Sequence, residues 1–314
     1  MRSRLLAALA ATTLVASAGC TSPATHAPVA VATTTELGSV VSDITTCAGG
    51  TSATLMGPGN DPHTFSVSSG QVAELVRAKL VVANGLGLEE GLAQTLANVS
   101  ADGGNVVEIA PTIDPIPFGG GHEAGEAHSH AEGDEHAHTG DDPHFWMDVK
   151  RMASAAGTIG ERLAQATGDA RYASCGREVS DKLTRVDADV RATLATIPAQ
   201  RRVLVTDHDA YAYFAKAYGF EIAGVVIPGG STDAEPSSAD LAGVIDTVKK
   251  EKVPAIFSNT TVSPKLVDTV ARESGQDVKV VPLYVDSVGP QGSGAETYAG
   301  MMTTNARLIA DALK

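Results

Sequence analysis

The chain has 314 residues, a formal net charge of −14 and a sequence pI near 5.0. This acidity argues against nucleic-acid binding, which depends on basic patches, and it mildly favours attraction of cations, although it also simply serves solubility. With 43% hydrophobic residues and a length sufficient for two medium-sized domains, the sequence predicts a globular protein rather than a disordered one.

The first nineteen residues have the composition of a signal peptide. Arg2 and Arg4 precede a short apolar run, and Ala16-Ser17-Ala18 resembles a small-residue cleavage site. A membrane-spanning helix needs about 20 apolar residues, so this run is too short to remain as one. We therefore predict a signal peptide over 1–19 and export from the cytoplasm.

Cys20 follows Ala18-Gly19 in an arrangement that resembles a lipobox, in which the cysteine is acylated and becomes the mature N-terminus. Ser17 departs from that pattern, where leucine is usual, so ordinary secretory cleavage after Ala18 stays an alternative. Residues 20–29 have the composition of a flexible tether. We expect a protein of the periplasm or cell surface that is lipid-anchored through Cys20.

The chain contains three cysteines. If Cys20 is lipidated, Cys47 and Cys175 remain as an even pair in an oxidising compartment, where disulfides form. The sequence does not give the distance that a bridge requires, so their pairing stays open. None of the close cysteine spacings of zinc thiolate sites is present.

From residue 29 to residue 109, short apolar runs alternate with amphipathic segments. The predicted strands are 29–33, 51–56, 80–83 and 106–109, and the predicted helices are 36–47, 69–78 and 89–98. Short strands separated by helices indicate a parallel α/β sheet.

The same alternation returns after residue 199. The predicted strands there are 203–206, 221–227, 255–258 and 278–282, and the predicted helices are 210–218, 239–249, 264–274 and 295–313.

Two helices are predicted between these halves, over 147–166 and 171–197. The second is long, its apolar residues recur every three or four positions, and Pro198 ends it. A coiled-coil partner is one explanation of such a stripe. A rigid helix joining two lobes explains it better, because the βα pattern restarts directly afterwards. The predicted organisation is an N-terminal lobe over 30–168, a linking helix over 169–198 and a C-terminal lobe over 199–314.

Residues 114–143 interrupt the first lobe with proline, glycine, histidine and acidic residues, a composition that predicts an exposed loop. Five of the nine histidines lie there, at His122, His128, His130, His136 and His138. Such a tract is typical of metal binding, and many ligands on a flexible chain predict weak, multiple and pH-sensitive binding. A tolerated acidic insertion without a role is the alternative.

The tripeptide Asp-Pro-His occurs twice, at 61–63 and 142–144. Imidazole is the commonest metal ligand in proteins. His208 and Asp286 follow predicted strands of the second half, and ligands in open α/β sheets bind beyond the carboxyl ends of strands. If the halves face each other, His63, His144, His208 and Asp286 can meet in one cleft. Three imidazoles and one carboxylate make a filled tetrahedral zinc site.

Each of these residues also has a simpler explanation. A lone histidine in a loop is usually solvated, and Asp286 would suit the cap of the turn that follows it. Asp207 and Asp209, beside His208, are good residues for the first turn of a helix, or they orient the His208 ring. The repeated tripeptide and the shared placement at strand ends favour ligands for the set as a whole.

Four stretches resemble the solute-binding proteins of metal ABC transporters (cluster A-I), specifically the zinc-type branch of ZnuA-like and AztC-like proteins. They read GPGNDPHTFSVSSGQVAELVRAKLVVANGLGLEEGL, DDPHFWMDVKRMASAA, VTDHDAYAYFAKAYGFEIAGV and VPLYVDSVGPQG. The resemblance implies two α/β lobes, each with a parallel four-stranded sheet and flanking helices, joined by one long rigid helix. It also implies that His63, His144, His208 and Asp286 coordinate the metal.

By the same resemblance the protein is not an enzyme but captures Zn²⁺ and delivers it to the permease of an ABC transporter. Manganese-type members tend to have glutamate where this chain has His208, and a site of three nitrogens and one oxygen favours zinc over the harder manganese ion. We expect a monomer whose partners are zinc, the permease and a zinc metallochaperone. A rigid linking helix predicts limited lobe closure, so that release would come from loop movement near Asp286.

Three alternatives remain at this point: a manganese- or iron-binding member of the same family, a secreted zinc-dependent hydrolase, and a surface adhesin with a structural metal. The hydrolase is disfavoured because catalytic zinc keeps an open position beside three protein ligands and because the chain has no His-Glu-x-x-His motif.

Overall fold

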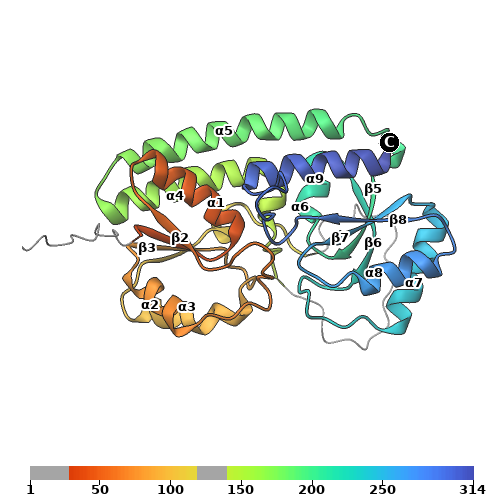
Figure 1. Ribbon diagram of the computed structural model, residues 1–314, viewed down its shortest axis with the longest axis horizontal. Helices are drawn as coiled ribbons and strands as arrows, with labels where there is room; N and C mark the ends of the chain where they lie inside the picture. The colour runs from red at the N-terminus through yellow and green to blue at the C-terminus, as the bar shows by residue number, and fades with distance from the viewer. Residues whose placement is uncertain (1–27, 119–139) are drawn as a thin grey trace, which may run out of the picture.

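The computed structural model describes residues 28–118 and 140–314, which form two α/β lobes with long helices running along one side (Figure 1). Each lobe has one parallel four-stranded sheet, with strand order β2-β1-β3-β4 in the N-terminal lobe and β6-β5-β7-β8 in the C-terminal lobe. The predicted fold class is thus confirmed. The signal peptide, Cys20 and the five histidines of 122–138 lie outside the described residues.

In the N-terminal lobe, α1 covers one face of the sheet, and α2 and α3 cover the other (Figure 1). The strands are β1 (Ala30–Ala32), β2 (Ser52–Thr54), β3 (Leu80–Ala83) and β4 (Val106–Glu108), and the helices are α1 (Thr35–Cys47), α2 (Ser69–Arg77) and α3 (Ala93–Ala101). The chain leaves β1 toward β2 on one side and returns to β3 on the other, so the strand order reverses at β1. Such reversal points, at the carboxyl ends of strands, are where open α/β sheets bind ligands.

The C-terminal lobe repeats this arrangement, with the reversal at β5. Its strands are β5 (Val203–His208), β6 (Glu221–Ile227), β7 (Ala255–Asn259) and β8 (Lys279–Leu283), and its helices are α6 (Ala212–Tyr218), α7 (Ser238–Glu251), α8 (Lys265–Glu273) and α9 (Tyr298–Leu313).

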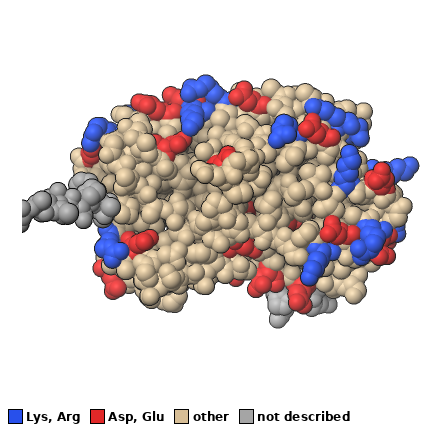
Figure 2. Space-filling model, viewed as in Figure 1, with Lys and Arg blue, Asp and Glu red and all other residues tan. Residues whose placement is uncertain are grey.

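Two helices, α4 (Val149–Thr167) and α5 (Arg171–Leu194), pack closely against each other, and α5 extends along both lobes (Figure 1). The close approach depends on Gly160 and Gly176, because a Cβ on either would collide with the backbone of the other helix. The apolar stripe of α5 faces α4, α1 and α9 of the same chain, so no coiled-coil partner is needed to cover it. The upper edge in Figure 2, where α5 lies in Figure 1, carries both acidic and basic side chains.

One hydrophobic core runs through both lobes. It joins residues of α1, α4 and α5 to residues of α6 and α9, such as Leu37, Ile159 and Leu183 with Phe214 and Met301. Each sheet also has a smaller hydrophobic cluster on its other face. The cluster of the N-terminal lobe lies beneath α2 and α3, and that of the C-terminal lobe lies beneath α7 and α8. Wide separation of the lobes would break a continuous core, so this packing favours local movements over hinge opening.

Several predicted bounds shift by a few residues in the structure, and two differences bear on the site. The strand β5 runs on to His208, so this residue belongs to the end of the strand instead of lying past it. The predicted loop over 114–143 has an ordered base in its described residues, where Pro117 and Asp141 form an antiparallel bridge and Ile116 and Asp142 are buried. The prediction that this whole range is exposed was therefore wrong, because its ends pair with each other and pack on the lobes. Among the described residues, no helix combines the length and apolarity needed to cross a membrane.

Cys47, at the end of α1, and Cys175, in α5, form a disulfide whose Cα atoms lie 5.8 Å apart. The two residues are separated by 128 positions in the sequence, so the bridge closes a long loop and fixes α5 to α1 of the N-terminal lobe.

Replacing both cysteines by serine should lower the free energy of unfolding by about 2–4 kcal/mol, because a cross-link over a long loop restricts the unfolded chain. Urea denaturation with and without the substitutions measures this effect. Reduction of the unsubstituted protein should shift the midpoint equally, whereas an unchanged midpoint in both experiments would contradict the expectation.

Candidate metal centre

His63, His144, His208 and Asp286 converge between the two lobes, and their four candidate ligand atoms all lie within 4.8 Å of one another. All four residues are buried: His63 is 5% exposed and the others are at most 1% exposed. The four residues singled out from the sequence are therefore brought together in one place.

The distances between these atoms suit a single tetrahedral ion. His63 Nε2 lies 3.4 Å from His144 Nε2 and 4.0 Å from Asp286 Oδ2, and His208 Nε2 lies 3.2 Å from Asp286 Oδ2. Zinc bonded at about 2.1 Å would separate tetrahedral donors by about 3.4 Å. Asp286 Oδ1 is buried without a hydrogen-bond partner among the described residues, a costly state that a bound cation would relieve.

Both Asp-Pro-His copies form the same turn. In each copy the aspartate Oδ1 accepts the backbone N–H of the histidine two residues later, at 3.0 Å from Asp61 to His63 and at 2.9 Å from Asp142 to His144. Asp142 Oδ1 also lies 2.7 Å from His144 Nδ1. This contact directs His144 Nε2 toward the other three candidate ligands, an arrangement that outer partners of metal-binding histidines also adopt.

His208 is oriented by its neighbour in β5. Asp207 Oδ1 lies 3.1 Å from His208 Nδ1, and Asp207 Oδ2 accepts the backbone N–H of Asn259 at 2.6 Å. Asp207 thus ties the end of β5 to the end of β7. Tyr211, rather than an aspartate, is the residue at the N-cap of α6, so the alternative that Asp207 caps that helix was wrong.

Asp286 does not cap a turn but faces the histidines, and its Oδ2 accepts a hydrogen bond from Asn259 Nδ2 at 2.6 Å. The segment that carries it is fixed to the His144 turn, because Trp146 Nε1 donates to the carbonyl of Val285 at 2.8 Å. The sequence interpretation missed Asn259 and Trp146. Asn259 ends β7, and the strand-end rule that selected His208 would have selected it as well.

The Asp286 carboxylate and the His208 imidazole each stabilise the charged form of the other. Burial by itself would raise the pKa of the Asp286 carboxyl, but the adjacent His208, with His63 and His144, holds it well below its ordinary value. For His208, burial lowers the pKa, but the Asp286 and Asp207 carboxylates outweigh it and raise the pKa well above the ordinary value. Without metal, a proton on His208 therefore partly replaces the cation.

Glu36, in the first turn of α1, is a further buried acid close to this centre. Burial, with a smaller contribution from the Asp286 charge, raises the pKa of its carboxyl to about 8. Thr35 Oγ1 lies 3.2 Å from Glu36 Oε2, and Glu36 Oε1 has no hydrogen-bond partner in the protein. No sequence signal marked this residue, since a glutamate in a first helical turn is usually exposed.

The metal-free protein should lose stability as the pH rises from 6.5 to about 8. His208 and Glu36 both have raised pKa values in the folded state, so folding is favoured where they hold protons and this gain disappears as they titrate. Zinc binding should change in the opposite direction, because ligands must lose protons to bind metal.

Melting temperatures with excess chelator and with zinc, across this pH range, measure both trends. Glu36→Gln should flatten the decline of the chelated protein. A chelated protein that becomes more stable over the same range would contradict the assignment of raised pKa values.

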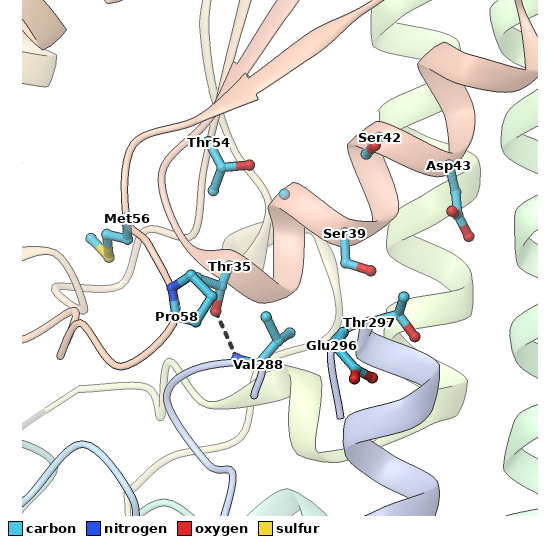
Figure 3. A pocket seen from close by; sticks show the side chains of 11 residues that line it. Thr35, Ser39, Ser42, Asp43, Thr54, Met56, Pro58, Val288, Glu296 and Thr297 are labelled. Carbon is cyan, nitrogen blue, oxygen red and sulfur yellow. Dashed lines mark hydrogen bonds between the residues drawn. The ribbon is translucent and has the colours of Figure 1, made fainter. Parts of the chain in front are cut away.

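A surface cavity beside α1 is separate from this centre. This cavity of about 270 Å³ is lined mainly by hydroxyl and carboxylate side chains, from α1, the segment after β2 and the start of α9 (Figure 3). None of the four converging residues lines it. The four side chains therefore form a site of their own, outside this cavity.

A family model described as "ZnuA: Zinc-uptake complex component A periplasmic" matches residues 30–312. The zinc-binding protein TroA of Treponema pallidum is 33% identical over 265 residues, which are 82% of this chain and 80% of that protein. The manganese-binding lipoprotein MntA of Halalkalibacterium halodurans is 32% identical over 249 residues, 79% of this chain and 76% of that protein.

The structure is also similar to solved ones. The periplasmic zinc-binding protein TroA from Treponema pallidum aligns with a TM-score of 0.77 at 31% identity, covering 91% of this chain and 99% of that chain. The similarity therefore extends over both lobes and the helices that connect them.

Proposed function

Because the chain belongs to the ZnuA family of metal-binding components of ABC transporters, we propose that its cargo is Zn²⁺, captured outside the cytoplasm and delivered to a membrane permease. The observation that carries this proposal is the donor set: three imidazole nitrogens and one carboxylate oxygen, buried at distances that suit a tetrahedral ion. Imidazole suits zinc, whereas manganese favours oxygen ligands. Family members are substrate-binding components rather than enzymes, so the hydrolase alternative is set aside.

Manganese is the second candidate cargo, because one relative is named a manganese-binding and another a zinc-binding protein. The test is competition: strip the purified protein with chelator, offer equimolar Zn²⁺ and Mn²⁺, desalt, and count the bound metal. One tightly bound zinc per chain is the expected result. Retention of manganese instead would overturn the choice of zinc.

We propose that the histidines of 122–138 collect zinc weakly and pass it to the buried centre. The base of this segment supports the idea, since Phe118, its last described residue on one side, packs on Gly230, where any side chain would collide with its ring. Gly230 lies two residues from Thr232, whose hydroxyl donates to Asp61 beside His63. The segment therefore starts close to one wall of the site.

Deleting residues 122–138 tests this role separately. Both forms should keep one tightly bound zinc, and only the full chain should bind additional weak zinc and load faster at low zinc concentration. Equal loading rates would remove the collecting role. Loss of tight zinc with the deletion would mean that the site itself is misplaced.

The remaining features of the proposal concern location and organisation. We propose cleavage of residues 1–19, lipidation of Cys20, a tether to residue 29, and a monomer that receives zinc directly or from a metallochaperone. We also keep the division into lobes at 30–168 and 199–314 around the linking segment 169–198. Mass spectrometry of the membrane-extracted protein tests the anchor: an acylated Cys20 at the N-terminus is expected, and an unmodified N-terminus contradicts it.

A further inference from the structure

Residues 57–63 lie within the connection from β2 to α2 and bring His63 into the candidate centre. A tight turn holds the start of the segment, where the Gly57 N–H donates to Asn60 Oδ1 at 2.8 Å and the Asn60 N–H donates to the Gly57 carbonyl at 3.0 Å. Among the described residues, the hydrogen bonds that 57–62 make outside the segment end on two hydroxyl groups, those of Ser287 and Thr232. Both belong to the C-terminal lobe.

Ser287 links this segment to the neighbouring ligand. The Gly59 N–H donates to Ser287 Oγ at 2.8 Å, and Ser287 directly follows Asp286. Ser287 is itself fixed, because its hydroxyl donates to the Val288 carbonyl at 3.0 Å while the Val288 N–H donates to Thr35 Oγ1 at 2.9 Å. Figure 3 shows the Thr35–Val288 bond with Pro58 beside it, where the segment after β2 meets the segment before α9.

Thr232 acts at the other end of the segment. Its Oγ1 donates to Asp61 Oδ2 at 2.6 Å, and Asp61 Oδ1 accepts the backbone N–H of His63 at 3.0 Å. A chain of two hydrogen bonds through one carboxylate thus connects the C-terminal lobe to the position of His63. Thr232 lies in the loop that follows β6. The Thr232–Asp61 hydrogen bond joins this loop to the N-terminal lobe.

The three histidines differ in how they are held. His144 and His208 are each fixed through both backbone and ring by an aspartate close in sequence, Asp142 or Asp207. Asp61 also accepts the backbone N–H of its histidine, but its second oxygen accepts from Thr232 in the opposite lobe. His63 is also the most exposed of the four candidate ligands. Contacts between the lobes therefore contribute to holding His63 in the centre.

We propose that Ser287 and Thr232 are positioning residues that hold His63 in its coordinating place, and that residues 57–63 form the movable wall through which metal enters and leaves. This inference rests on the proposed function. Breaking the two hydroxyl contacts weakens the attachment of the segment to the C-terminal lobe while His144, His208 and Asp286 keep their own partners. The site then has three protein ligands and an open position, a form from which metal dissociates more readily.

The experiment measures zinc dissociation by stopped flow, with a strong chelator in excess, for Thr232→Val, Ser287→Ala and the double variant. Loss of an outer partner typically weakens metal binding about 10–100-fold, and we expect the dissociation rate to rise by that factor in the double variant while association changes little. The absorption of the Co²⁺-loaded protein should lose intensity in the double variant, as a tetrahedral site does when it opens to water.

Controls separate positioning from a general loss of structure. Thr232→Ser keeps the hydroxyl and should restore the parental rate. Ser231→Ala removes a neighbouring hydroxyl that accepts the backbone N–H of Asp233 in the same loop. Melting temperatures with chelator should agree among the Thr232 variants. If Ser287→Ala folds poorly, Thr232→Val alone still tests the claim, with a smaller increase expected.

His63→Ala is measured alongside to separate two failures. If His63→Ala binds zinc as tightly as the parent, the proposed site is wrong. If His63→Ala weakens binding but the hydroxyl variants dissociate within twofold of the parent and keep the Co²⁺ spectrum, the positioning role is overturned and the site stands.

Discussion

Replacing His208 by alanine should abolish tight zinc binding. His208 is fully buried, and its Nε2 faces the Asp286 carboxylate, with Oδ2 3.2 Å away. The substitution removes one of four donors and leaves the Asp207 and Asp286 carboxylates without their cationic neighbour. Removal of an outer partner typically lowers metal affinity by about 10–100-fold, and the loss of affinity in His208→Ala should therefore be larger. Competition with a chromophoric chelator measures the affinity.

A suitable control is His26→Ala, which removes a histidine of the predicted tether and should leave the affinity unchanged. The melting temperature in chelator shows whether the His208 variant still folds. A folded His208→Ala protein that retains zinc with the parental affinity would contradict the assignment of this residue as a ligand.

Replacing the same residue by glutamate should shift the preference from zinc toward manganese. The change converts a site of three nitrogens and one oxygen into one of two nitrogens and two or more oxygens, and harder cations favour oxygen donors. The equimolar Zn²⁺/Mn²⁺ competition measures the ratio of retained metals. We expect the ratio of retained manganese to retained zinc to rise by at least tenfold relative to the parent. A tenfold change corresponds to about 1.4 kcal/mol in relative binding free energy.

The matched control is His208→Gln, which has the length of glutamate but no charge and should weaken both metals. Asp207 would face the new carboxylate at close range, so His208→Glu is also made with Asp207→Asn to relieve repulsion between like charges. An unchanged metal ratio in both glutamate variants would show that the donor set does not decide the cargo.

The strands and helices could be predicted from the sequence because they depend on local patterns. Apolar runs ended by glycine and proline marked the strands, and the regular stripe marked α5, which ends at Leu194 instead of Ile197 because a tight turn precedes Pro198. The boundary near His208 was wrong, since β5 is extended by pairing of His208 with Ile227 in β6, a contact that local sequence does not encode.

The candidate site followed from a rule about sheets rather than from any single residue. Strand-end placement selected His208 and Asp286, and the repeated tripeptide selected His63 and His144. The turn geometry behind the repeat, in which each aspartate accepts the histidine N–H, explains why the tripeptide occurs twice. Contacts between distant segments could not be predicted, and these include Asn259 to Asp286 and Thr232 to Asp61.

The central claim is that one zinc ion lies among these four side chains. Crystals of the zinc-loaded protein, measured on both sides of the zinc absorption edge, test it most directly. We expect a single anomalous peak bonded at about 2.0–2.2 Å to Nε2 of His63, His144 and His208 and to an Asp286 oxygen. A zinc peak elsewhere, with these four side chains unliganded in a protein that binds zinc tightly, would contradict it.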